Sequence, residues 1–485
     1  MTTEERSDPI RAADPADSTV PAVSAVSAVS AVPAVPAAPA GRRRDLAAAA
    51  AGALLVAVAI GVGWVIQEGD GSLQVHWPPL LASWDPHIGP GTPAALAVAA
   101  AVIAFGPRAA ARMPWRGLLL TCWAGSVAWI LSLALIEGWY RGIERRLTTK
   151  HEYLRVIDRF DDIGAALRGF TDHIVIGPPG NWPAHVAGHP PGATLTFVGL
   201  DRAGLGGGAW AGMWCIVLGG SAAAAVMVAL RALTGEELAR RAAPFLVLAP
   251  FAVWTGTSAD GYFAAVAAWS VALLAVATTR TAGHPAAAAL GSGLLFGLTC
   301  YLSYGLTLVA ALLAAVLLLG RTARPLGLLV LGALVAPVAF TLAGFNWWEA
   351  YHLLVERYYQ GAGGTRPYGY WVWANLACAT LAAGFATVAG LRRAVVSVPA
   401  AVRGLRPGTL THAQRLACVT LAALLALAVA DLSGMSKAET ERIWQPFVVW
   451  LIPAAALLPA AGRRGWLAAQ AAVALLINHL LWTGW

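Results

Sequence analysis

The sequence predicts an all-α fold, a polytopic bundle of transmembrane helices. Of its 485 residues, 58% are hydrophobic and 12% are charged, and the mean hydropathy is +0.64. Apolar runs of the length that crosses a bilayer recur along the chain. Arginine-rich connections alternate with connections that carry nearly all of the carboxylates, and the positive-inside rule places the arginine-rich ones in the cytoplasm. The net charge of +8 is spread over these short connections, which argues against nucleic-acid binding.

Two regions differ in composition. Residues 1–41 are rich in Ala, Val, Pro and Ser and lack large apolar side chains, so we expect a disordered cytoplasmic tail. Arg42, Arg43 and Arg44 hold the next segment on the cytoplasmic side, and residues 42–485 form one transmembrane domain. The five cysteines are widely spaced within apolar runs, and their spacing is typical of small core residues rather than of disulfides or a metal site.

The alternation of apolar and charged segments predicts about 13 spans. In order, they are 46–67, 91–106, 117–139, 209–230, 243–257, 261–279, 285–303, 305–320, 325–343, 371–391, 415–432, 443–460 and 465–483. The N-terminus is then cytoplasmic and the C-terminus extracytoplasmic. Three long external loops follow, at 140–208, 344–370 and 433–442.

Carboxylates are distributed unequally between the two sides. The connections predicted to be cytoplasmic contain only Asp45, Glu236 and Glu237. The predicted external side holds Glu68, Asp70, Asp85, Glu144, Glu152, Asp158, Asp161, Asp162, Asp172, Asp201, Asp260, Glu349, Glu356, Glu439 and Glu441. A pump or channel is expected to carry ionisable groups at mid-membrane depth, so this distribution favours chemistry at the outer face.

The first external loop has helical spacing over residues 151–174. Apolar side chains recur there every three or four residues, at Leu154, Ile157, Phe160, Ile163, Leu167, Phe170 and Ile174. This pattern predicts an amphipathic helix lying on the outer leaflet. Asp158 and Asp162 would share its polar face, and Asp161, Asp162 and Asp158 are candidate general bases, with Asp162 preferred. Ordinary surface ion pairs with Arg155 and Arg159 would explain the same residues.

Further along this loop, His189 precedes Pro190 and Pro191. Two prolines before an apolar run predict the start of a helix, because proline fits its first turn. His189 would lie near the positive end of that helix and is a candidate substrate-binding residue, although it could also just cap the turn. The apolar run 193–200 is too short to cross the membrane.

The last external loop supplies cations on an otherwise acidic face. Arg442, at the start of a predicted span, is a candidate ligand for the phosphate of a lipid-linked donor, because guanidinium pairs its donors with phosphate oxygens. Lys437 and Arg366 are candidate secondary contacts, and Glu441 is a candidate substrate-binding residue. Snorkelling of these cations to the headgroup region is the alternative interpretation.

These motifs together resemble the GT-C superfamily of polytopic glycosyltransferases, which includes protein O-mannosyltransferases, lipid A aminoarabinose transferases and actinobacterial arabinofuranosyl- and mannosyltransferases. The resemblance is carried by Arg159-Phe160-Asp161-Asp162, by His189-Pro190-Pro191 and by the segment from Lys437 to Trp444, and it covers most of residues 117–485. It implies a polyprenyl-phosphate-linked sugar donor, a first-loop Asp as base and extracytoplasmic cations for the donor phosphate. The chain departs from the family in that its acidic loop follows the third predicted span, whereas in the family it follows the first.

The sequence therefore predicts a cell-membrane glycosyltransferase that transfers a sugar to an envelope glycan, lipid or protein at the extracytoplasmic face, among membrane lipids. We expect no metal and no cofactor to be required. A multi-pass transporter or flippase of envelope precursors is the alternative, and it would favour polar groups within the spans and inverted repeats. A catalytically inactive scaffold for envelope assembly is a third possibility.

Overall fold

The computed structural model describes residues 39–177, 179–281, 283–403 and 410–483. The predicted disordered tail lies outside the described residues except for 39–41, which already belong to the first helix. Seven of the described helices are long and apolar enough to cross a membrane. They are α1 (Pro39–Asp70), α2 (Thr92–Arg112), α3 (Trp115–Ala134), α7 (Gly208–Thr234), α10 (Ala259–Thr278), α11 (Pro285–Leu302) and α19 (His412–Leu432).

Two further apolar stretches are sharply bent, and counting each as one span raises the number of candidate spans to nine within the described residues. In the first, α13 (Leu326–Ala333) and α14 (Val335–Leu342) meet α15 (Trp347–Gln360) at 80°. In the second, α17 (Tyr368–Ala383) meets α18 (Phe385–Arg403) at 109°. The span predicted at 371–391 is thus bent within its length, because Gly384 breaks the helix with a φ of 79°, a conformation that glycine adopts without steric cost.

The prediction of thirteen spans is not shown by the structure. Its four remaining segments are helical but are either shorter or more polar than the nine candidates. They correspond to α8 (Glu236–Val247) with α9 (Ala252–Thr255), to the 3₁₀ helix η6 (Tyr304–Val309) with α12 (Ala310–Gly320), to α21 (Gln445–Val448) with η7 (Ile452–Leu457), and to α22 (Arg463–Leu480).

The all-α prediction holds except for one small sheet. Strand β1 (Ala82–Trp84) pairs antiparallel with β2 (Leu481–Thr483), with Ser83 opposite Trp482. These three-residue strands are too short to show an alternating pattern in the sequence. The sheet fastens the connection after α1 to the C-terminal end of the described chain.

The amphipathic helix predicted at 151–174 is also corrected. Three short helices occupy the region: the 3₁₀ helix η4 (Tyr153–Phe160), α4 (Ile163–Arg168) and the 3₁₀ helix η5 (Thr171–His173). The apolar positions do share one buried side, but they pack into the core of the protein and not onto the outer leaflet, since Phe160, Phe170 and Ile174 are fully buried in it. The break comes at Asp162, whose side chain accepts the backbone N–H of Ala165 and caps α4. Asp158 and Asp162 therefore do not share one face of a continuous helix.

The remaining short elements lie in the connections between the longer helices. They are η1 (Leu135–Glu137), the π-helical turn η2 (Tyr140–Glu144), η3 (Arg146–Thr148), α5 (Ala184–Ala187), α6 (Pro191–Arg202), α16 (Ala362–Thr365) and α20 (Thr440–Ile443). The prediction that a helix begins at the double proline is confirmed, because α6 starts at Pro191. The predicted loop 344–370 consists mainly of α15 and α16; Asn346 caps α15 through the N–H groups of Trp348 and Glu349.

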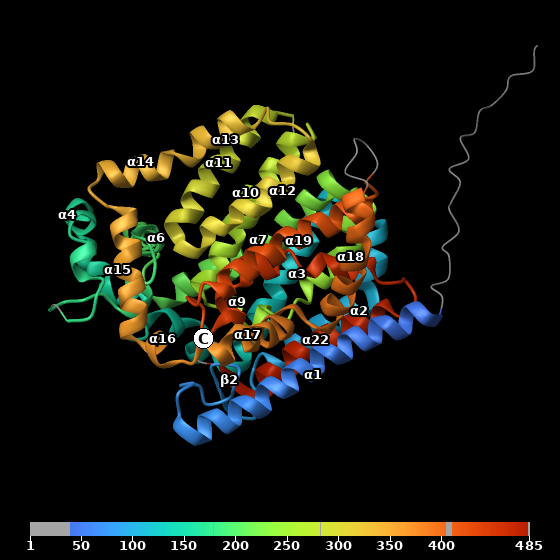
Figure 1. Ribbon diagram of the computed structural model, residues 1–485, viewed down its shortest axis with the longest axis horizontal. Coiled ribbons are helices and arrows are strands. Elements are labelled where there is room, and N and C mark those ends of the chain that lie inside the picture. Colours follow the sequence, from blue (N-terminus) through green and yellow to red (C-terminus); the bar gives the residue numbers. More distant parts are fainter. Residues whose placement is uncertain (1–38, 178, 282, 404–409, 484–485) are drawn as a thin grey trace, which may run out of the picture.

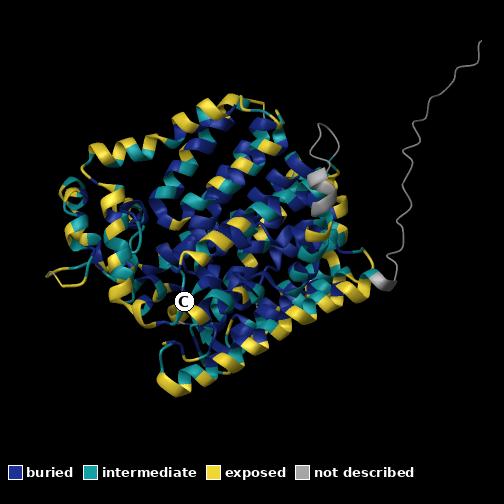
Figure 2. Ribbon diagram, viewed as in Figure 1, coloured by how far each residue is buried: buried dark blue, intermediate teal, exposed yellow. Residues whose placement is uncertain are grey.

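Helices pack closely where small residues meet. Gly293 and Gly297, four residues apart on α11, lie against the backbone of Leu329 and Ala333, and Gly332 of α13 returns the contact toward Leu290. This small-xxx-small arrangement lets backbones approach in a membrane, where water does not drive helices together. Helix α10 lies in the buried interior, whereas α1, α13 and α14 expose large apolar faces, the surface that lipid would cover (Figure 2).

Charged side chains gather at both ends of the bundle, in different arrangements. Figure 1 shows the start of α1 and α18 at one end, and α4, α6, α15 and α16 at the other. At the first end, each of the three acids predicted to be cytoplasmic is paired with arginine: Asp45 with Arg392 and Arg393, Glu236 with Arg231 and Arg240, and Glu237 with Arg241. The second end holds a large cavity.

Candidate active site

The cavity has a volume of about 1230 Å³. Six parts of the chain line it: residues 74–83, 140–155, 176–189, 354–366, 439–442 and Trp482. Most of them belong to connections predicted to be external, so the fold brings these distant loops together at one end of the bundle. The volume exceeds that of typical small-molecule sites.

The lining is strongly cationic. Glu439 is the only carboxylate among the lining residues that the structure describes, and four histidines (His76, His151, His185 and His189) are also present. The cations are Arg141, Arg145, Arg146, Lys150, Arg155, Arg357, Arg366 and Arg442. A concave surface with this charge attracts and concentrates anions.

Three of these eight cations have a carboxylate partner within 4 Å. Arg141 pairs with Glu137 at 3.3 Å and with Asp85 at 3.7 Å, and Arg366 and Arg442 belong to the network described below. The other five have no such partner among the described residues: Arg145, Arg146, Lys150, Arg155 and Arg357. Arg146 donates to the carbonyl of Thr483 at 2.7 Å, and burial lowers its pKa to about 10. The cavity therefore keeps an excess of positive charge.

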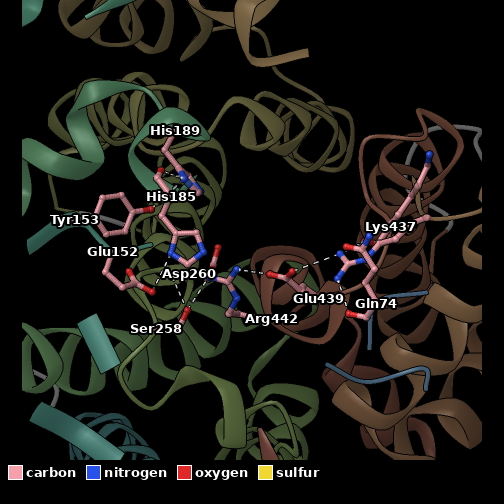
Figure 3. A network of polar contacts seen from close by, with 11 residues as sticks. Gln74, Glu152, Tyr153, His185, His189, Ser258, Asp260, Lys437, Glu439 and Arg442 are labelled. Carbon is pink, nitrogen blue, oxygen red and sulfur yellow. Dashed lines mark hydrogen bonds and ion pairs between the residues drawn. The ribbon is translucent and has the colours of Figure 1, made fainter. Parts of the chain in front are cut away.

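Four charges that are buried or half-buried alternate in sign beside the cavity, and Figure 3 labels three of them: Asp260, Arg442 and Glu439. Arg442 lies between two carboxylates, 2.8 Å from Asp260 and 3.0 Å from Glu439, and the other oxygen of Glu439 lies 3.6 Å from Arg366. Asp260, Arg442 and Arg366 are 5%, 6% and 8% exposed. We call Asp260, Arg442, Glu439 and Arg366 the ion-pair chain. Because each buried charge has an opposite neighbour, the group is balanced and held in place.

The backbone around the ion-pair chain is strained. Ala438 and Glu439 have φ values of 72° and 64°, and Thr257, three residues before Asp260, has a φ of 71°. Residues with a Cβ rarely adopt such conformations, which cost on the order of 1–3 kcal/mol each and gather at functional sites. Strained backbone thus lies next to both carboxylates that contact Arg442. This strain indicates that their positions serve a functional site.

The environment of Glu439 makes it a poor proton acceptor. Burial disfavours its ionised form, but Arg442 and Arg366 outweigh that effect and keep its pKa below the usual glutamate value. A carboxylate with a lowered pKa binds a proton weakly at neutral pH. Glu439 is therefore better suited to positioning the two arginines.

Two histidines lie near Asp260, at one end of the ion-pair chain (Figure 3). The Nδ1 atom of His185 lies 2.9 Å from Oε1 of Glu152, which is only 4% exposed. The Nδ1 atom of His189 donates to the carbonyl of His185 at 2.7 Å and lies 3.1 Å from the hydroxyl of Tyr153. Burial lowers the pKa of His189 to about 4, so this imidazole is neutral over the physiological range.

The structure brings some of the predicted site residues into the cavity. Arg442, Arg366 and His189 line it. The ammonium of Lys437 does not, since it donates to the carbonyl of Gly363 at 2.8 Å. Glu441 is fully buried outside the lining, and burial raises its pKa to about 7.

The predicted aspartate bases lie elsewhere. Asp158, Asp161 and Asp162 are exposed, and none of them lines the cavity. In the described part of the chain, no group of three or more His, Cys, Asp or Glu side chains is placed to hold a metal ion.

Sequence reasoning missed the basic segment 141–155 and the pairing of Glu152 with His185. Glu152 was identified only as one external acid among fifteen. A signal was present, however: His185 and His189 are four residues apart, the spacing that brings side chains together on one helical turn. The ion-pair chain had no comparable signal, because 182 residues separate Asp260 from Arg442.

No family model and no curated protein matches this sequence. Several solved structures are similar to this one at low sequence identity and with TM-scores below 0.5. ArnT from Cupriavidus metallidurans bound to undecaprenyl phosphate is 16% identical, with a TM-score of 0.45, over 68% of this chain and 59% of that one. The Archaeoglobus fulgidus oligosaccharyltransferase in the apo form is 14% identical, with a TM-score of 0.47, over 76% of this chain and 55% of that one.

The oligosaccharyltransferase AglB from Archaeoglobus fulgidus, in complex with an inhibitory peptide and a dolichol-phosphate, is 12% identical, with a TM-score of 0.43, over 75% of this chain and 55% of that one. The chain thus spans less than two thirds of the length of each of these proteins.

Proposed function

We propose that the protein is a membrane glycosyltransferase that transfers a sugar from a polyprenyl-phosphate donor to a cell-envelope acceptor. The observation that carries this proposal is the cationic cavity at the end of an apolar helical bundle, with five cations that lack a carboxylate partner among the residues that the structure describes. The motif resemblance to the GT-C superfamily points to the same reaction. The glycan, lipid or protein class of the acceptor is left open by the cavity.

The chemistry requires positive charge at this place. When the bond between the sugar and the phosphate breaks, negative charge builds up on the departing phosphate, and fixed cations stabilise it. The polyprenyl tail can stay in hydrocarbon while the phosphate enters the cavity from the edge of the bundle.

We propose that Arg145, Lys150 and Arg155 hold the phosphate, because they line the cavity, are exposed in it and have no ion-pair partner among the described residues. Arg442 and Arg366 stay candidate ligands. Their charges are already partly compensated by Asp260 and Glu439 in the ion-pair chain. Lys437 stays a weaker candidate, since its ammonium is bonded to a carbonyl.

Donor binding tests this assignment. Purified protein titrated with undecaprenyl phosphate should show quenching of its tryptophan fluorescence, as the chain has 21 tryptophans. The triple variant Arg145→Ala/Lys150→Ala/Arg155→Ala should bind about ten- to hundredfold more weakly, because hydrogen bonds to charged groups contribute roughly 1.5–3 kcal/mol. The matched control is Arg321→Ala/Arg324→Ala, two exposed arginines in the connection predicted to be cytoplasmic. Equal affinities for the triple variant and the parent would contradict the proposed phosphate site.

We further propose that the cavity faces the extracytoplasmic side and that all thirteen predicted segments cross or enter the membrane. Cysteines introduced at Arg159 and Arg168 should react with an impermeant thiol reagent in intact cells, and a cysteine at Arg324 should react only after lysis. The five native cysteines are buried or half-buried, so they should contribute little background. The opposite labelling pattern would reverse the orientation.

A further inference from the structure

We infer that His185 accepts the proton of the acceptor hydroxyl and that Glu152 positions its ring. The inference rests on the proposed function, since it names the base of that reaction. It differs from the assignment of the base to Asp161 or Asp162, which the motif resemblance implies.

Two bonds fix His185 to one short segment. Its Nδ1 atom lies 2.9 Å from Oε1 of Glu152, and its backbone N–H donates to the carbonyl of His151 at 3.0 Å. Glu152 is buried and absent from the cavity lining, whereas His185 lines the cavity (Figure 3). In this arrangement the imidazole faces the cavity and the buried carboxylate lies behind it. Such a carboxylate orients the ring and stabilises its protonated form.

The reaction balances with His185 in this role. The acceptor oxygen forms a bond to the anomeric carbon of the sugar while the bond between that carbon and the phosphate oxygen breaks. The electron pair of the broken bond leaves with the phosphate, whose charge the cavity cations neutralise. The hydroxyl proton passes to the imidazole of His185, and Glu152 compensates the new positive charge.

Other groups in the described site suit the role less well. Glu439 lies between two arginines that lower its pKa, and His189 has a pKa of about 4 because of burial. Both are weak bases at neutral pH. Asp161 and Asp162 are exposed outside the cavity lining, so an acceptor bound in the cavity would not meet them.

His185 belongs to a cluster of charged and titratable groups. These groups come from four parts of the fold: His151, Glu152 and Tyr153 before and in η4, His189 ahead of α6, Asp260 in α10, and Glu439 and Arg442 at α20. Among them, the carboxylate of Glu152 lies 2.9 Å from the Nδ1 atom of His185. We therefore expect the loss of this carboxylate to lower the rate through the orientation of the ring.

The test is transfer from a polyprenyl-phosphate sugar by the full-length protein, measured as kcat and as apparent donor affinity from pH 5 to pH 9. His185→Asn and His185→Gln should each lower kcat roughly 10²- to 10⁴-fold, the usual contribution of a general base, with donor affinity unchanged. Glu152→Gln should lower kcat with donor affinity unchanged, and Glu152→Asp should recover part of the rate. His352→Asn and Glu349→Gln, on the exposed face of α15, are the matched controls and should keep the parental profile.

The outcomes separate this inference from the function on which it rests. If the parent protein transfers no sugar from any polyprenyl-phosphate donor, the proposed function fails. If the parent is active and a folded His185 variant keeps its rate, the inference is wrong. It is also wrong if Asp161→Asn or Asp162→Asn loses the rate while the His185 variants do not. The role of Glu152 is wrong if Glu152→Gln weakens donor affinity as much as it lowers kcat, or if Glu152→Asp recovers none of the lost rate, since the glutamate would then have only a structural role.

Discussion

Replacing Arg442 with alanine is expected to lower the free energy of unfolding by about 3–5 kcal/mol, the cost of breaking a buried ion pair. The substitution leaves the buried carboxylate of Asp260 and the half-buried carboxylate of Glu439 without the guanidinium that lies between them. It also removes the ion pair between Arg442 and Glu439, which stabilises the strained backbone at Ala438 and Glu439. A loss of this size is large relative to the usual stability of a folded protein.

Thermal unfolding of the detergent-solubilised variants measures this effect. Arg442→Lys keeps the charge but cannot span both carboxylates, so it should lose less stability and less donor affinity than Arg442→Ala. The exposed Arg324→Ala is the control and should stay within about 0.5 kcal/mol of the parent. If Arg442→Ala melts with the parent and binds undecaprenyl phosphate equally well, the ion-pair chain stabilises neither the fold nor the site.

The same variant has a predictable pH dependence. The arginines lower the folded-state pKa of Glu439, so its stabilising contribution is present above the unfolded-state pKa of about 4.3 and is lost as the pH falls through the lower folded-state value. The difference in melting temperature between the parent and Arg442→Ala should therefore be full at pH 7 and shrink below about pH 4.

Replacing Asp45 with alanine is expected to loosen α1 from α18, at a cost of about 3 kcal/mol. Both carboxylate oxygens of Asp45 accept hydrogen bonds from arginines of α18, at 2.8 Å from Arg392 and 2.6 Å from Arg393. The carboxylate is almost fully buried, whereas each arginine side chain is a quarter exposed. The loss should therefore lie at the lower end of the range for broken buried pairs, since the arginines can still reach water.

Hydrogen exchange separates this effect from global unfolding. Amides in the first turns of α1 and in the middle of α18 should exchange faster in Asp45→Ala, while those of the central helix α10 should keep their protection. Glu68→Ala, an exposed acid near the other end of α1, is the matched control. Uniformly faster exchange throughout the protein would mean that Asp45 supports the whole bundle rather than the contact between α1 and α18.

The fold class was available from the sequence alone because its signals are local. Long apolar runs predict membrane helices wherever they occur, and Pro190 and Pro191 mark the start of α6 without reference to any other part of the chain. The buried face of residues 151–174 was likewise predicted from spacing, although Asp162 interrupts the helix by capping α4.

The site was decided by tertiary structure. The sequence singled out Arg442 for its charge, but it could not supply the partner, because Asp260 lies 182 residues earlier and any of fifteen external acids was an equal candidate. The same holds for Glu152 with His185, for Asp45 with Arg392, and for the pairing of Ser83 with Trp482. Periodicity and turn residues report how a segment folds on itself. Which charges meet depends on how the helices pack, since a buried charge is stable only where packing brings an opposite charge within reach.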